Sequence, residues 1–156
     1  MSWVYSCGAG ANYGTALESA LKIGETIHIP SCCYEIEEYI HGPNLQLTPQ
    51  YNVIFFDGND GASRRVEQVY KATRKVSNRA YLISNNPQLS SDDHVLSLSD
   101  TVSSELCPLV YLPFVQLLSF IVSNDLHSIY QHPLLKEFKA IAAAKTENFV
   151  NYDGDD

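Results

Sequence analysis

Short apolar runs alternate with segments of helical pattern along this sequence, and that alternation limits the possible folds more than any other feature. The runs of strand type are Trp3–Ser6, Ile27–Ile29, Asn52–Phe56, Ala80–Ser84 and His94–Leu98, and the helical segments cover about 15–26, 62–76, 103–124 and 133–149. Helices between strands provide the long crossovers that parallel strands need. The pattern predicts a three-layer αβα sandwich with a five-stranded, mostly parallel sheet. A ligand site is expected at the carboxyl ends of the strands.

The chain has room for one domain. Its 156 residues form a single predicted domain over residues 1–150, followed by a polar tail, 151–156, that we expect to fray. Eighteen acidic against ten basic side chains give a net charge of −8, which opposes a nucleic acid or an anionic membrane surface as partner. A phosphorylated ligand would therefore need a local site.

The longest apolar run, Leu106–Val122, is predicted to be a buried helix. Pro108, Pro113 and Gln116 interrupt it, and it falls short of the roughly 20 apolar residues of a membrane span. Met1 is followed by neither a basic region nor a long apolar one. We therefore expect no signal peptide, a cytoplasmic location and no membrane partner.

The four cysteines show no metal-binding spacing. Cys7, Cys32, Cys33 and Cys107 contain no C-x-x-C motif, and the adjacent pair has poor geometry for a disulfide. We expect reduced, partly buried thiols and no metal site.

A glycine turn, Gly8-x-Gly10-x-x-x-Gly14, lies between the first strand and the first helix. Its spacing is one residue too long for the dinucleotide fingerprint, so an NAD-binding function is disfavoured and no organic cofactor is expected. Either the turn packs the helix closely on the strand, or its amides face an anionic ligand. In the second case Gly8, Gly10, Asn12 and Tyr13 are the candidate substrate-binding residues.

A second glycine turn, Asp57–Ser63, opens the helix predicted over residues 62–76. Asp57 and Asp60 would repel a phosphate here, and we expect them to cap the helix instead. Arg64 and Arg65 could offset the repulsion or form a solvated face.

Glu25, Glu38 and His41 form the sharpest candidate catalytic group. Glu25 ends an otherwise apolar helix, where partial burial would raise its pKa towards that of a general base. His41 precedes Gly-Pro on a loop and could exchange protons with a sugar oxygen. The alternatives are a surface position for Glu25 and a capping or core imidazole for His41.

The segments G-A-G-A-N-Y-G-T-A-L-E-S-A-L-K-I-G-E-T and Y-E-I-E-E-Y-I-H-G-P, within Gly8–Pro43, resemble the sugar isomerase (SIS) domain. The form they resemble is the second SIS copy of glucosamine-6-phosphate synthases and fructosamine-6-phosphate deglycases, with G-A-N-Y-G closer to the deglycases. Leu112–Leu118 is similar to the family's L-P-x-x-Q-L-L helix, and the resemblance extends to about Pro133. It implies a flavodoxin-like strand order.

The resemblance also implies roles for particular residues. Glu25, sixteen residues before His41, matches the base that moves a proton between C1 and C2 of the sugar. His41 matches the ring-opening histidine, which in the synthases reaches a neighbouring subunit, and Glu38 matches an acid that orients this loop. Lys145 and Lys139 are candidates for the lysine that forms a Schiff base in the synthases, although this tail differs from theirs.

The family's phosphate loop, S-x-S-G-x-T, is absent, and Asp57–Gly61 stands after the third strand instead. The chain therefore resembles the half of a phosphosugar isomerase or deglycase that needs a second SIS domain to hold the phosphate of an aminated sugar. We expect a homodimer or higher oligomer. The alternative is a non-catalytic sugar-phosphate-binding or dimerisation module.

Overall fold

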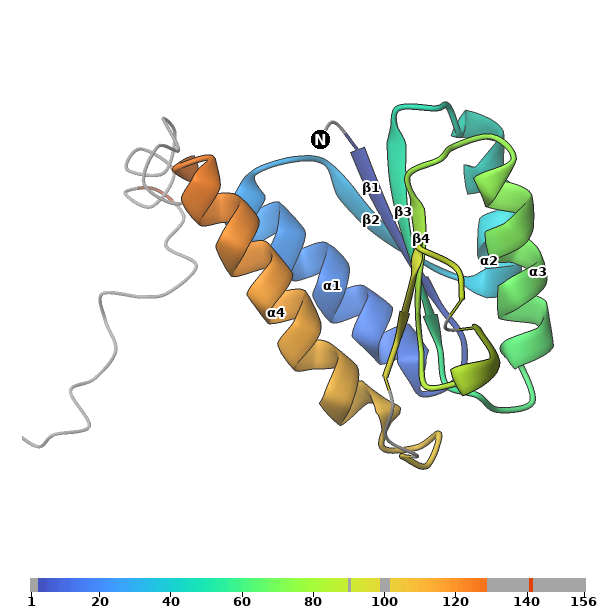
Figure 1. Cartoon of the computed structure of the whole chain (residues 1–156). Coiled ribbons are helices and arrows are strands. Elements are labelled where there is room, and N and C mark those ends of the chain that lie inside the picture. Colours follow the sequence, from blue (N-terminus) through green and yellow to red (C-terminus); the bar gives the residue numbers. More distant parts are fainter. Residues whose placement is uncertain (1–2, 90, 99–101, 129–140, 142–156) are drawn as a thin grey trace, which may run out of the picture.

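A computed structural model describes residues 3–89, 91–98, 102–128 and 141, which form one sheet with helices on both faces (Figure 1). The strands are β1 (Trp3–Gly8), β2 (Ser31–Glu35), β3 (Tyr51–Asp57), β4 (Ala80–Ser84) and β5 (Val95–Ser97). The helices are α1 (Asn12–Ile27), α2 (Ile36–Ile40), α3 (Ser63–Arg74) and α4 (Cys107–Asp125), with 3-10 turns η1 (Pro43–Gln46) and η2 (Pro87–Leu89). All paired strands are parallel, in the order β2-β1-β3-β4-β5. The predicted fold class is confirmed.

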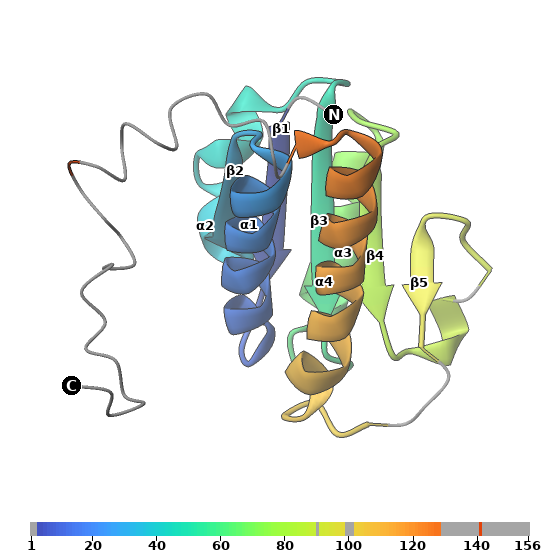
Figure 2. The same cartoon turned by 90° about the vertical axis from the view of Figure 1, so that its left-hand side faces the viewer.

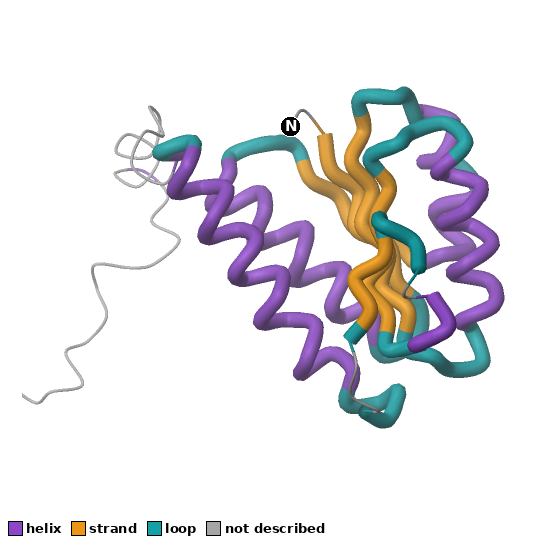
Figure 3. Tube along the Cα trace, viewed as in Figure 1, coloured by secondary structure: helices purple, strands orange, loops and turns teal. Residues whose placement is uncertain are grey.

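The sheet separates two apolar cores. On one face α1 and α4 lie side by side, and on the other lie α2 and α3 (Figures 2 and 3). Alternate strand residues supply the two cores: Val4, Ile54, Phe56 and Ile83 face α1 and α4, whereas Tyr5, Val53, Phe55 and Leu82 face α2 and α3. Because both faces are covered, the central strands are apolar throughout, which is why the sequence made them recognisable.

The second strand differs from its prediction, which was Ile27–Ile29. Ile27 is the last residue of α1, and it packs in the same core as Ile23, one helical turn earlier. His28 then adopts a left-handed conformation, with φ 61°, that ends the helix. The strand forms only after Pro30, whose carbonyl accepts a hydrogen bond from the Val4 amide. Helical packing of Ile27 therefore outweighed its strand propensity.

Helix α4 forms as predicted, but its expected burial is wrong. Tyr111 and Val115 are fully buried against the sheet, whereas Leu109 and Phe120 are 69% and 63% exposed. Among the helices in the described ranges, α4 alone has the length and composition to cross a membrane. The core helix of a soluble protein can have the same length and composition.

Candidate functional site at the carboxyl ends of the strands

The strand order reverses between β1 and β3, and the loops that follow these strands face each other. A Cβ atom on Gly58 would lie 2.8 Å from Asn12 Nδ2, and one on Gly10 would lie 3.7 Å from Asp60 Oδ2. In open parallel sheets, ligands bind outside the carboxyl ends of the strands at the point where the strand order reverses. The site predicted at the carboxyl edge would therefore lie where these two loops meet.

Asn12 is the polar side chain at the centre of this loop pair. It is fully buried, and its Oδ1 accepts a hydrogen bond from Thr15 Oγ1 at 3.1 Å. Its Nδ2 has no hydrogen-bond partner among the described residues. A buried amide that lacks a partner costs free energy, so this group is available to a ligand oxygen or a water molecule.

Gly8 and Gly10 serve two different purposes in the first loop. A Cβ on Gly8 would stand 2.3 Å from the Asn12 carbonyl oxygen, so only glycine lets α1 begin this close to β1. Gly10 has a φ of 54°, in the left-handed region. The close-packing interpretation of the turn therefore holds for Gly8, while Gly10 is exposed.

Tyr13, at the start of α1, interacts with Cys33 of β2, and the charge of Glu38 acts on both groups. The charge of the Cys33 thiolate raises the pKa of the Tyr13 hydroxyl, and Glu38 and Glu35 add to this shift. Burial raises the pKa of the Cys33 thiol. At neutral pH Tyr13 and Cys33 therefore stay protonated, and a neutral phenol can donate a hydrogen bond to a sugar oxygen.

His41 follows α2 next to an ion pair. The Arg65 guanidinium donates from Nε and Nη2 to the Glu37 carboxylate, at 2.6 and 3.1 Å, and lowers the pKa of that carboxyl. His41 is exposed and close enough to Glu37 to contribute to this shift. The neighbouring acids of α2 thus differ: Glu37 is paired with α3, and Glu38 interacts with the residues at the ends of β1 and β2.

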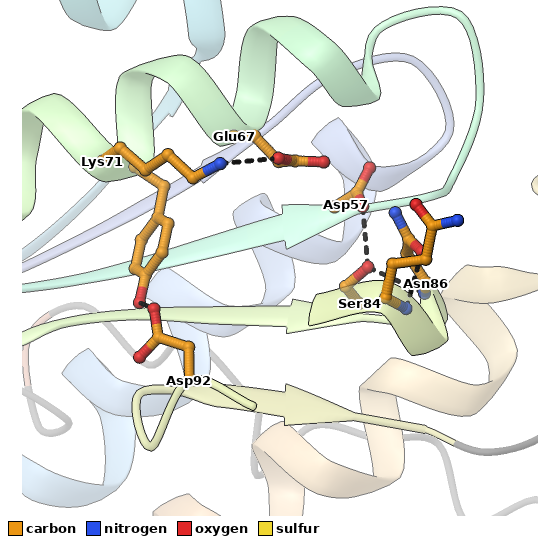
Figure 4. A network of polar contacts seen from close by, with 8 residues as sticks. Asp57, Glu67, Lys71, Ser84, Asn86 and Asp92 are labelled. Atoms are coloured by element: carbon orange, nitrogen blue, oxygen red, sulfur yellow. Dashed lines mark hydrogen bonds and ion pairs between the residues drawn. The ribbon is translucent and has the colours of Figure 1, made fainter. Parts of the chain in front are cut away.

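Asp57 fills the carboxyl end of β3. Its buried carboxylate accepts hydrogen bonds from the Asn59 amide at 3.0 Å and from Ser63 Oγ. It also accepts one from Ser84 Oγ at 2.7 Å (Figure 4). The Ser63 and Ser84 hydroxyls, which could otherwise donate to a phosphate, therefore already donate to Asp57.

The predicted capping role of Asp57 is wrong, because α3 begins after Ala62, which makes no side-chain cap. Asp60 is nearer to that role, since its Oδ1 accepts from the Ala62 amide at 2.8 Å. Ser84 and Cys33 were not predicted as site residues. Ser84 lies on β4, which pairs with β3, and Cys33 lies on β2, which pairs with β1. The strand order would have placed both next to the strands that carry the two loops.

Glu25 lies at the other pole of the molecule. Helix α1 starts at the carboxyl end of β1 and returns to the start of β2, so Glu25, near its end, lies by the amino ends of the strands. Its side chain is 50% exposed and accepts a hydrogen bond from Lys22 at 3.0 Å, so the expected partial burial is not observed. The charge of Glu38 acts on Tyr13, whereas Glu25 lies at the opposite end of the sheet. Lys139, Lys145 and the tail 151–156 lie outside the described residues.

An apolar cavity of about 350 Å³ opens on the α1/α4 side of the sheet. Its lining includes Val4, Ile27 and Tyr81, which lie near the amino ends of the strands, and Phe114 of α4. This position and the scarcity of polar groups do not suit a sugar phosphate. The loop pair remains the better candidate site.

All four cysteines are free thiols. Within residues 3–89, 91–98 and 102–128, no three His, Cys, Asp or Glu side chains form a group that could hold a metal ion.

Comparisons with known proteins agree with this geometry. No protein-family model matches the sequence. The isomerizing glutamine–fructose-6-phosphate aminotransferases of Idiomarina loihiensis and Methanothermobacter thermautotrophicus are 28% and 31% identical to the chain over 118 and 122 residues. These matches cover 74% and 76% of the chain but only 19% and 20% of the two aminotransferases, so the chain spans about a fifth of the length of its curated relatives.

Solved structures show the same fold. A protein assigned as a phosphosugar isomerase from Clostridium difficile has a TM-score of 0.73 and 22% identity, and the match covers 87% of this chain and 38% of that one. The C-terminal domain of the glucosamine–fructose-6-phosphate aminotransferase of Francisella tularensis has a TM-score of 0.68 and 24% identity, with 79% and 35% covered. The resemblance recognised in the sequence is confirmed: the chain has the sugar isomerase (SIS) fold of phosphosugar isomerases and is homologous to a segment of the isomerizing aminotransferases.

Proposed function

We propose that this chain is one half of a phosphosugar isomerase or deglycase, in which a second SIS domain, from the same protein or another, holds the phosphate. The observation that carries this proposal is the buried Asp57 carboxylate, which accepts hydrogen bonds from the hydroxyls of Ser63 and Ser84. A phosphate at the end of β3 would meet a negative charge and find these donors already engaged. The SIS fold and the aminotransferase homology support the substrate class.

An aminated sugar suits this half best. Glu35, Glu38 and Asp60, which lie near the carboxyl ends of the strands, are acidic, and they would attract the ammonium group of a substrate such as fructosamine 6-phosphate or glucosamine 6-phosphate. The proposed reaction moves one proton between C1 and C2 through an enediol or enamine, and a carboxylate base takes the proton from one carbon and returns it to the other. This chemistry needs no metal and no redox cofactor.

The catalytic groups are divided between two places. Glu38 and the Tyr13 hydroxyl would serve the loop site of their own chain, where the acid and the phenol would hold sugar hydroxyl groups. Glu25 is half exposed at the opposite pole, so as a base it would act in the site of a neighbouring domain. His41, exposed after α2, is likewise open to a neighbour. Each half alone would therefore be weakly active or inactive.

Ligand binding tests the proposed absence of phosphate recognition. By isothermal titration, glucosamine and glucosamine 6-phosphate are expected to bind the chain within about 3-fold of each other, because no phosphate contact is gained. N-acetylglucosamine, which lacks the ammonium charge, should bind more weakly, and Glu38→Gln should weaken glucosamine binding about 5- to 10-fold through the loss of one exposed charge contact. Arg64→Gln is the control, because Arg64 is exposed and lies on α3. Glucosamine 6-phosphate binding more than about 30-fold tighter than glucosamine would contradict the proposal.

Isotope exchange distinguishes catalysis from binding. In deuterated water, glucosamine 6-phosphate incubated with stoichiometric protein, at a concentration at which copies of the chain meet, is expected to exchange its C2 hydrogen slowly, because Glu25 would act in the site of a neighbouring copy. Glu25→Gln should reduce that exchange by at least about 100-fold with binding unchanged, because an amide cannot act as the base. Glu18→Gln is a matched control, since Glu18 lies on the same helix and also pairs with Lys22, at 3.5 Å. NMR spectroscopy follows the exchange, and an unchanged rate in Glu25→Gln would remove that residue from the mechanism.

A non-catalytic dimerisation module is the second candidate. It is favoured by the apolar outward surface of α1 and α4, where Leu17, Leu21 and Leu117 are about half exposed. In that case glucosamine 6-phosphate would bind without any C2 exchange, in the wild type as in the Glu25 variant.

A further inference from the structure

The α2/α3 side of the domain carries a groove that the proposed function does not use. It has a volume of about 330 Å³ and is lined by residues of α2, η1 and α3, on the face of the sheet opposite α1 and α4 (Figure 1). Its lining includes the apolar side chains of Ile40, Leu47, Val69 and Val76, and Val76 is 48% exposed. An apolar lining of this extent can hold a large side chain of a docked segment.

Asn44 gives this groove a hydrogen-bond acceptor that is not in use. It belongs to η1, and its Oδ1 is buried without a hydrogen-bond partner in the part of the chain that the structure describes. A buried acceptor costs free energy unless an N–H or O–H group meets it. A backbone amide of a peptide can do so, whereas a carboxylate or an ionised phosphate brings only acceptors. The groove therefore suits a polypeptide better than a bare polyanion.

The helix beside the groove is basic, although the whole chain has a net charge of −8. Six of the ten Lys and Arg residues stand between positions 64 and 79, where Glu67 is the only acid. Arg64, Lys71 and Lys75 follow one another at intervals of seven and four residues and therefore share one face of α3. An acidic partner would be attracted to this side of the molecule.

Two of these three basic side chains have their charge free. All three are exposed. Lys71 pairs with Glu67 at 3.0 Å (Figure 4), whereas Arg64 and Lys75 form no ion pair with any residue that the structure describes. Each lies next in sequence to a residue that lines the groove, Arg65 or Val76. The positive charge and the groove therefore adjoin.

The chain itself contains a segment of complementary composition. Residues 146–156 lie outside the described ranges, and their sequence is T-E-N-F-V-N-Y-D-G-D-D. The segment combines four acidic side chains and no basic one with the apolar residues Phe149, Val150 and Tyr152. Such a segment can set its carboxylates against a basic helix face and an aromatic ring in the groove beside that helix.

The intervening chain is long enough for this segment to reach the groove. The described part of the chain after α4 ends at Ser128, and the 17 residues 129–145 separate it from Thr146. At about 3.3 Å per residue they can span up to about 56 Å. A domain of this length is about 40 Å across, so the segment can reach either face of the sheet.

We propose that residues 146–156 dock on the α2/α3 side of their own chain, with the ring of Phe149 in the groove and the carboxylates along Arg64, Lys71 and Lys75. A backbone amide of the segment would then donate to Asn44 Oδ1. This docking replaces the expectation that residues 151–156 fray. It goes beyond the proposed function, because it involves neither the sugar site nor a second SIS domain.

Carbodiimide cross-linking of the full chain tests this docking. The reagent condenses a carboxylate with a lysine amine that it touches, and it takes up the water that is lost and becomes a urea. Mass spectrometry of the digested protein then locates each new amide. We expect links from Asp153 or Asp155 to Lys75, in chains that keep the mass of a monomer.

Lys22 is the control within the same molecule. It lies on α1, on the other face of the sheet, and pairs with Glu18 and Glu25 at 3.5 and 3.0 Å. We expect it to link to these two neighbours and not to the segment 146–156. Its links also show that the reagent has reacted and that α1 is folded.

Two variants test the role of the groove. Phe149→Ser is expected to reduce the yield of links from the segment to Lys75 by at least about 5-fold, because the groove loses its aromatic occupant. Asn148→Ser, one position earlier, is the matched control and should leave this yield unchanged. The links of Lys22 should persist in both variants.

Four results would overturn the proposal. The first is a segment that links to Lys22 or to no lysine of the described residues, and the second is an equal yield in Phe149→Ser and the wild type. The third is a mixture of isotope-labelled and unlabelled chains in which the segment links only between copies, which would place it on a neighbouring chain. The fourth is binding of a fluorescent single-stranded DNA with a Kd below about 10 µM, which would assign the basic surface to a nucleic acid. None of these results concerns sugar binding or C2 exchange, so the proposed function is tested separately.

Discussion

Replacing Gly8 with alanine is expected to lower the free energy of unfolding by about 3 kcal/mol or more. The new Cβ would lie 2.3 Å from the Asn12 carbonyl oxygen and 2.7 Å from its carbonyl carbon. Both atoms belong to the backbone of the first turn of α1, so no side-chain rotation can relieve the overlap. The helix would have to move away from β1, and the loop that bears Gly10 and Asn12 would move with it.

Urea unfolding followed by circular dichroism measures this effect. Gly14→Ala is the control, because Gly14 lies in the same helix and an added Cβ there would meet nothing within 4 Å. That variant should be stabilised by about 0.5–1 kcal/mol, since alanine loses less backbone entropy than glycine in a helix. A Gly8→Ala protein as stable as the wild type would show that α1 does not start this close to β1.

Asp57→Ala has the second largest expected effect, a destabilisation of about 3–5 kcal/mol. The substitution removes the acceptor of the Asn59 amide and of two hydroxyls, those of Ser63 and Ser84. The Ser84 hydroxyl is fully buried, so it would lose a charge-assisted hydrogen bond without gaining water. The loop after β3 and the end of β4 would lose the hydrogen bonds through which Asp57 joins them.

Asp60→Ala provides the comparison within the same loop. Asp60 is exposed, and its carboxylate accepts one amide hydrogen bond, from Ala62. We expect a loss of about 1 kcal/mol there, similar to the loss of a helix cap. Thermal and urea unfolding of the two variants give the difference. Equal losses would mean that the Asp57 carboxylate is not the anchor of this edge, and would weaken the argument that it replaces a phosphate.

Most of the architecture could be predicted from local pattern. The apolar run Asn52–Phe56 predicted β3 to within a residue at each end, and the helix pattern after Asp57–Gly61 predicted α3. These elements are recognisable because burial on both faces of a parallel sheet requires continuous apolar residues. Ile27 shows the limit: an isoleucine suits a strand or a helix, and only its packing beside Ile23 selected the helix.

The candidate site was predicted in part. The glycine turn and Glu38 were predicted from the sequence; the structure adds an interaction between Tyr13 and Cys33, on which the charge of Glu38 acts. The Asp57–Ser84 hydrogen bond joins residues 27 positions apart, and nothing local in the sequence indicates it. The roles of Glu25, His41 and Lys145 stay predictions.

The sequence by itself determined the layer order, the parallel sheet and the positions of the glycine turns, because periodicity and glycine act over a few residues. Only the tertiary structure decided which polar groups share a site and which apolar groups reach the core. Helix α1 carries Glu25 about 20 Å along its axis from Asn12, and α4 presents one apolar side to the sheet and the other to solvent. Both outcomes depend on the direction and depth at which a helix packs on the sheet, and these are set by contacts distant in the sequence.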